Sequence, residues 1–140
     1  FELRAALFDT VARQVAATRP PELLAVLRSG LLRLEELAST PDGGDAYAET
    51  TYRLLMITAR FCSNMRLQRL LASLSLQTLR YSKLGLASEV RRQRSAKLWR
   101  QALNALERGD AERLIALTRQ RIQESGAEAT RRLGMQEQTA

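Results

Sequence analysis

The chain has 140 residues, of which 45% are hydrophobic and only 5% aromatic, and its 22 Lys and Arg against 15 Asp and Glu give a net charge of +7. It contains no histidine, and so lacks the commonest metal ligand and general base. Its one cysteine, Cys62, cannot form an internal disulfide, which fits a reducing cytoplasm. No Gly-rich phosphate loop or nucleophile motif occurs, which argues against an enzyme, and no uncharged apolar run is long enough to cross a membrane.

Three helices are predicted in the first half of the chain. Strong helix formers dominate the sequence and no alternating Val/Ile/Tyr-rich run occurs, so we predict an all-α fold. Apolar residues at helical spacing predict a helix over Phe1–Thr18 and, after a Pro-Pro pair, a second over Pro21–Ala38. The Pro- and Gly-rich segment Ser39–Asp45 is predicted to be a loop, and a third helix follows from about Ala46 to Cys62.

Capping residues indicate where the next two helices begin. Asn64 is placed to cap a fourth helix over roughly Met65–Lys83. After a short connector, Ser88 is placed to cap a fifth helix that ends at Arg108.

A sixth helix is predicted from its cap and its closing glycine. Gly109 ends the fifth helix, Asp110 caps the sixth, and Gly134 closes it, so that the polar tail 135–140 is expected to fray. Short connections between all these helices predict an antiparallel bundle of about six to seven helices over residues 1–134.

Arg121 is the residue least expected at its position. It follows Leu117 by four residues on the apolar stripe of the sixth helix, and Trp99 stands on the stripe of the fifth. An arginine turned toward a core is costly unless an anion meets it, which makes Arg121 our leading candidate for ligand contact. An internal salt bridge, for example to Glu49, or a guanidinium that extends to the end of the bundle are the alternatives. Trp99 is either a cavity wall or an ordinary core residue.

The positive charge has two interpretations. It could attract nucleic acid, or it could belong to an arginine-rich solvated surface. The only dense basic cluster is Arg91-Arg92-Gln93-Arg94, and no base-stacking aromatic residues are interleaved with the arginines. The solvated surface is therefore the favoured interpretation.

Three segments, taken in order and spacing, carry a family resemblance. The first is Arg4-Ala5-Ala6-Leu7 followed by Val15-Ala16-Ala17, the second is Ser63-Asn64 followed by Leu67 and Leu70-Leu71, and the third is Ala105-Leu106-Glu107-Arg108-Gly109-Asp110-Ala111. Together they resemble the C-terminal ligand-binding domain of GntR-superfamily transcription regulators of the FadR subfamily, called the FCD domain. The resemblance extends over nearly the whole chain.

The resemblance also implies that this chain has lost the metal site of its family. Many members of the family hold a divalent metal with one Asp and three His. Counted from Asn64 and Asp110, the matching positions of this chain are Thr51, Leu55, Trp99 and Arg121, and none of these is an adequate metal ligand. The resemblance therefore implies a metal-free member without a cofactor, in which Arg121 stands where a metal ligand would.

Three further residues complete the predicted ligand site. Thr58 shares a helix face with Leu55, although back-bonding to their own helix is the alternative for both Thr51 and Thr58. Asn64 is a helix cap that could also line the pocket, and Arg80, near the end of its helix, either reaches the pocket or stays exposed. The predicted ligand-binding residues are Arg121, Trp99, Leu55, Thr51, Thr58, Asn64 and Arg80.

By this resemblance the chain is the effector-binding and dimerisation domain of a bacterial GntR-type regulator. We expect a homodimer in the cytoplasm that binds a small organic acid in a metal-free cavity and contacts no membrane. DNA would be bound only through an N-terminal winged helix-turn-helix that is absent from this chain, which opens on Phe1 rather than Met. Two alternatives remain: a purely structural dimerisation module whose cavity is filled by Trp99, Leu55 and Met56, or a basic helical bundle that binds nucleic acid.

Overall fold

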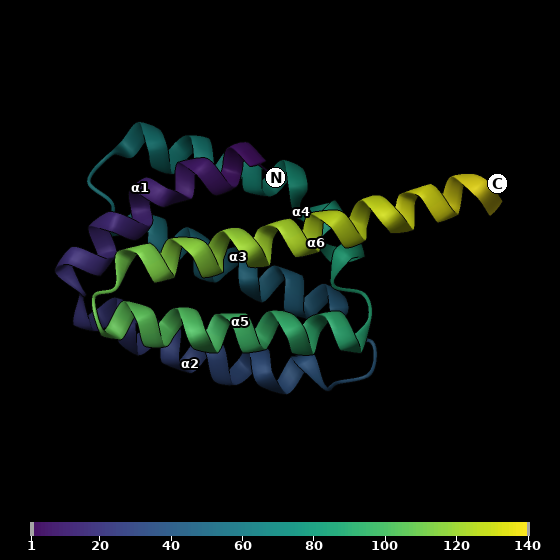
Figure 1. Ribbon diagram of the computed structural model, residues 1–140, viewed down its shortest axis with the longest axis horizontal. Coiled ribbons are helices and arrows are strands. Elements are labelled where there is room, and N and C mark those ends of the chain that lie inside the picture. The colour runs from purple at the N-terminus through teal and green to yellow at the C-terminus, as the bar shows by residue number, and fades with distance from the viewer. Residues whose placement is uncertain (1, 140) are drawn as a thin grey trace.

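A computed structural model describes residues 2–139, and over these residues it contains six α-helices and no strand. The helices are α1 (Glu2–Thr18), α2 (Pro21–Ala38), α3 (Gly44–Arg60), α4 (Met65–Gly85), α5 (Glu89–Glu107) and α6 (Ala111–Thr139). They form an antiparallel bundle in which α6 packs against α1, α4 and α5, while α2 packs against α3 and α5 (Figure 1). The predicted all-α bundle is confirmed. The predicted helix start at Phe1 and the final residue, Ala140, lie outside the described residues.

Local capping chemistry fixes the starts of the last three helices as predicted. The side-chain oxygens of Asn64, Ser88 and Asp110 each accept a hydrogen bond from the backbone N–H three residues later, at 3.0, 3.3 and 3.1 Å. Gly109 adopts a φ of +70°, the left-handed conformation that ends a helix at low steric cost.

Several helix limits differ from the prediction, and the largest difference is in α6. That helix continues through Gly134 to Thr139, so the predicted helix end at Gly134 is wrong. A single glycine costs a helix only about 1 kcal/mol relative to alanine, too little to end it without a turn signal behind it. The C-terminal part of α6 projects beyond the bundle (Figure 1). Fraying of the tail stays a prediction.

A buried arginine ties together the connections at one end of the bundle. The Arg92 guanidinium is only 2% exposed and donates hydrogen bonds of 2.7–3.2 Å to the carbonyls of Leu37, Thr40, Leu86 and Ala87. These carbonyls lie at the end of α2 and just after it, and between α4 and α5, so one side chain holds both connections. None of the helices within residues 2–139 is long and apolar enough to span a bilayer.

Candidate functional site

A small internal cavity lies where five of the six helices converge. Its volume is about 30 Å³, and only α4 contributes no side chain to its wall. From α1, α2 and α3 come Phe8, Ala12, Val15, Leu27, Leu31 and Leu55, and from α5 and α6 come Trp99, Ala102, Leu103, Leu106 and Leu114. The polar members of the wall are Thr58, Thr118 and Arg121. The cavity is therefore apolar with one cationic corner.

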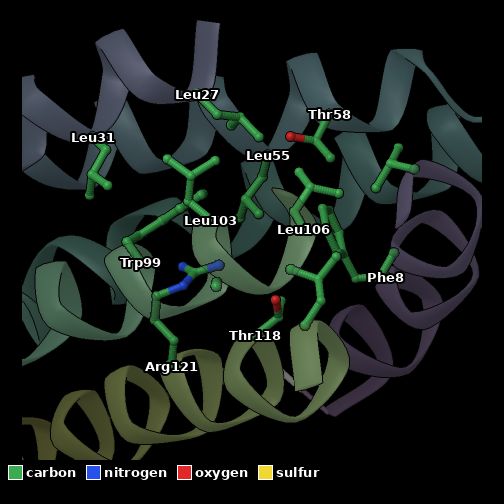
Figure 2. A pocket seen from close by; sticks show the side chains of 14 residues that line it. Phe8, Leu27, Leu31, Leu55, Thr58, Trp99, Leu103, Leu106, Thr118 and Arg121 are labelled. Atoms are coloured by element: carbon green, nitrogen blue, oxygen red, sulfur yellow. The ribbon is translucent and has the colours of Figure 1, made fainter. Parts of the chain in front are cut away.

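Arg121 points into this cavity and lies against Trp99. Figure 2 shows the guanidinium turned from α6 toward the indole ring, and the distance from Arg121 Cζ to the ring centroid is 4.2 Å. Arg121 is only 6% exposed, and it takes part in no hydrogen bond or ion pair within the described part of the chain. The proposed alternative partner, Glu49, binds Lys83 instead, at 3.0 Å. Arg121 is thus a buried cation whose contact is the face of an aromatic ring.

Burial shifts the proton equilibria around this corner. Desolvation lowers the pKa of Arg121 from 12.5 to about 9, so the guanidinium is still charged at neutral pH but at a cost. Burial likewise raises the pKa of Tyr47 to about 12, although its hydrogen bond to Ser95 and the charge of Arg121 oppose that shift. The Tyr47 hydroxyl donates to Ser95 Oγ at 2.9 Å. Desolvation in a low-dielectric interior is the main cause of both pKa shifts.

The four positions that the family resemblance matched to metal ligands lie together. Trp99 Nε1 donates a hydrogen bond of 3.0 Å to Thr51 Oγ1, and Leu55, Trp99 and Arg121 line the same cavity. Thr51 contacts the indole through this hydrogen bond but does not itself line the cavity. Counting along helices therefore identified one connected cluster.

The other predicted site residues separate into one that lines the cavity and two that do not. Thr58 lines it, but its hydroxyl donates to its own helix at Leu54 O, 2.8 Å away, which was the alternative for this residue. Asn64 is exposed and caps α4, and Arg80 is exposed and donates to the Tyr81 hydroxyl at 2.9 Å. Placing Asn64 and Arg80 beside the cavity is wrong, because both side chains are exposed and neither lines its wall.

The comparison with protein families agrees with this architecture. The family model described as "FCD domain" matches residues 1–124, most of the chain. The chain belongs to the FCD domain family. FCD domains are the regulatory, ligand-binding domains of GntR-type transcription regulators and are not typically enzymes. No curated protein and no solved structure matched the chain in the two other comparisons.

The cavity of this FCD domain is chemically unsuited to a divalent metal. Its polar groups are two hydroxyls and a guanidinium, which is a permanent cation at neutral pH and offers no lone pair. Over residues 2–139 no three His, Cys, Asp or Glu side chains come close enough to hold a metal ion. The donor set present fits an anion better than a cation.

Sequence reasoning missed several residues that shape the FCD cavity. Thr118 lines it three residues before Arg121, a spacing that places both on one face of α6 and could have identified it. Phe8 brings α1 to the cavity, which only the tertiary packing shows. Met56, which only the alternative of a filled cavity placed inside the bundle, lines a surface groove between α3 and α4.

The dense basic cluster is used within the domain. Arg92 is buried, and Arg91 and Arg94 both pair with Glu124 of α6, at 3.5 and 3.2 Å. Because Arg92 is buried and Arg91 and Arg94 share one carboxylate, the cluster offers few unpaired arginines to a DNA backbone.

Proposed function

We propose that this FCD domain senses a small monocarboxylate with an apolar tail, as the effector domain of a GntR-type regulator. The observation that carries the proposal is the buried Arg121 guanidinium, which faces an otherwise apolar cavity without a carboxylate partner. A buried charge is costly until an anion compensates it, and a guanidinium binds a carboxylate through two parallel hydrogen bonds. A carboxylate in the cavity would remove that cost, which supports an acid as effector.

The cavity lining limits which acids would fit. Besides Arg121, only the hydroxyl of Thr118 has no hydrogen bond among the described residues, since Thr58 donates its proton to Leu54 O. One anionic group therefore finds partners. A second carboxylate, or the several hydroxyls of a sugar acid, would be buried against leucines without partners, which disfavours such ligands.

The volume of the cavity limits the effector further. About 30 Å³ is room for roughly two water molecules, whereas pockets for drug-sized ligands measure about 300–1,000 Å³. Even acetate, with four heavy atoms, therefore needs the surrounding side chains to move, and a longer acid needs them to move further. The same small volume favours a second candidate, a structural dimerisation module whose cavity is filled, chiefly by Trp99 and Leu55.

A route from the cavity to DNA would pass through α1. Phe8, Ala12 and Val15 of α1 line the cavity, so an acid that separates Arg121 from Trp99 would alter how α1 packs. In the regulator we propose, α1 follows a winged helix-turn-helix, and two copies pair as a homodimer in the cytoplasm. The acid shifts the orientation of the DNA-binding domains only as far as its affinity differs between the two arrangements. Membership of the FadR subfamily stays a prediction.

Thermal denaturation of the protein with a panel of compounds tests this function. The panel comprises straight-chain acids from acetate to hexanoate, succinate, gluconate, a long-chain acyl-CoA, and Zn²⁺ and Ni²⁺. A ligand at about 100 times its Kd adds about 2.7 kcal/mol and raises the Tm by several degrees. We expect this rise with monocarboxylates only. Stabilisation by metals alone would contradict the proposal, and no response to any compound would favour the filled dimerisation module.

A further inference from the structure

The positive charge of the protein is concentrated in one continuous segment. Residues 50–88 contain five arginines and one lysine but no aspartate or glutamate, so this segment carries six of the seven net positive charges. It comprises most of α3 and all of α4. A solvated surface normally intersperses both signs, so an acid-free stretch of this length indicates a surface that meets negative charge.

Four arginines of this segment remain available to a partner. Arg53, Arg60, Arg66 and Arg69 are exposed, and none of them forms an ion pair with another described residue. Glu49, the acid that borders the segment, is occupied by Lys83. These four arginines therefore differ from Arg91 and Arg94, which pair with Glu124.

Three of these arginines surround an apolar groove between α3 and α4. The groove measures about 550 Å³, and its wall includes Arg53, Met56, Ile57, Arg60, Arg69 and Ala72. Its α4 side extends through Met65, which is 63% exposed, and Leu76, which is 62% exposed. Helical spacing of three to four residues places both on the face of α4 that carries Arg69 and Ala72. The floor is therefore apolar and the rim is basic.

We infer that this α3–α4 groove binds an acidic amphipathic helix of a partner protein. The apolar side chains of such a helix would cover Met56, Ile57 and Leu76, and its flanking carboxylates would meet Arg53, Arg60 and Arg69.

Exposed Leu76 and Met65 favour this partner over DNA, whose phosphate backbone gives apolar side chains nothing to cover them. A helix that lies on a membrane carries its basic and its apolar residues on opposite faces, whereas here the arginines are interleaved with apolar residues on one face. A second copy would bring the same positive face, and a two-fold pair would place like charges opposite each other.

Fluorescence anisotropy with synthetic helices tests the inference on the whole 140-residue chain. The probe is a labelled peptide of about five helical turns, with leucines on one face and glutamates flanking them; a matched peptide has lysines in place of the glutamates. The groove variant is Arg60→Glu with Arg69→Glu. The control variant is Arg108→Glu with Arg113→Glu, which reverses two exposed arginines at the turn between α5 and α6. Leu76→Ser separately removes an exposed apolar contact.

The expected results are specific to charge and to shape. The acidic peptide should bind and the basic one should not, with an affinity that falls between about 50 and 300 mM salt. The groove variant should weaken binding at least about tenfold, Leu76→Ser should weaken it severalfold, and the control variant should leave it unchanged. Equal binding of the two peptides would overturn the inference. The inference would also be overturned if a DNA duplex or phosphatidylserine vesicles bound more tightly than the acidic peptide, provided that the groove variant lost this binding and Leu76→Ser kept it. Self-association that the groove variant abolishes would assign the face to a second copy.

Discussion

Replacing Arg121 by methionine should make the free protein more stable. Burial lowers the pKa of Arg121 from 12.5 to about 9, and each unit corresponds to about 1.36 kcal/mol, so the charged form costs about 4–5 kcal/mol in the folded state. Methionine removes that cost and also removes the contact with the Trp99 ring, which contributes about 1–2 kcal/mol when desolvated. The free energy of unfolding should therefore rise by about 2–4 kcal/mol at pH 7.5.

Urea denaturation followed by circular dichroism measures this change. The midpoint should move to higher urea with the slope unchanged, since the surface exposed on unfolding is almost the same. Adding an acid that binds should raise the urea midpoint of the wild type and leave the midpoint of Arg121→Met unchanged. A variant less stable than the wild type would refute the reasoning, because Arg121 would then stabilise the free protein and no anion would be needed.

Four further results are expected. The stability difference between wild type and Arg121→Met should shrink by about 1.3 kcal/mol from pH 8 to pH 10 in urea titrations, because above pH 9 the unfolded state holds a proton that the folded state has released. Arg92→Met should have the opposite sign to Arg121→Met and lower the free energy of unfolding by at least about 3 kcal/mol, since four hydrogen bonds to backbone carbonyls are lost. Thr118→Val should change stability by less than about 1 kcal/mol but weaken acid binding about tenfold by calorimetry. In thermal melts Gly85→Ala should destabilise, because its Cβ would collide with the backbone of α6, whereas Gly134→Ala, with nothing within 4 Å, should stabilise by up to about 1 kcal/mol.

The fold could be predicted because its signals are local. Asn64, Ser88 and Asp110 accept backbone hydrogen bonds where their positions ahead of apolar stripes predicted caps. The end of α6 could not be predicted in the same way. Gly134 is followed by polar residues that neither start a turn nor stop a helix, so the choice between helix and coil there depends on small energies.

The candidate site could be predicted where helix periodicity fixes direction. The inward position of Arg121 agrees with its spacing to Leu117, whereas the proximity of Trp99 was implied only by the family resemblance, which matched both positions to metal ligands. The positions of Asn64 and Arg80 depend on which face of α4 the neighbouring helices cover, which no local pattern gives. Arg92 escaped prediction for a related reason: its partners are backbone carbonyls in two connections, which carry no side-chain signature.

Trp99 gives the most direct test of the central claim, that the cavity binds a small monocarboxylate through Arg121. It is the only tryptophan in the chain and lies against that guanidinium, so its fluorescence reports on this site alone. Titration with butyrate at constant ionic strength and pH 7.5 should give a saturable change in the wild type, no change with gluconate or succinate, and none in Arg121→Met. An equal response of Arg121→Met to butyrate, or no response of the wild type to any of the acids from acetate to hexanoate, would contradict it.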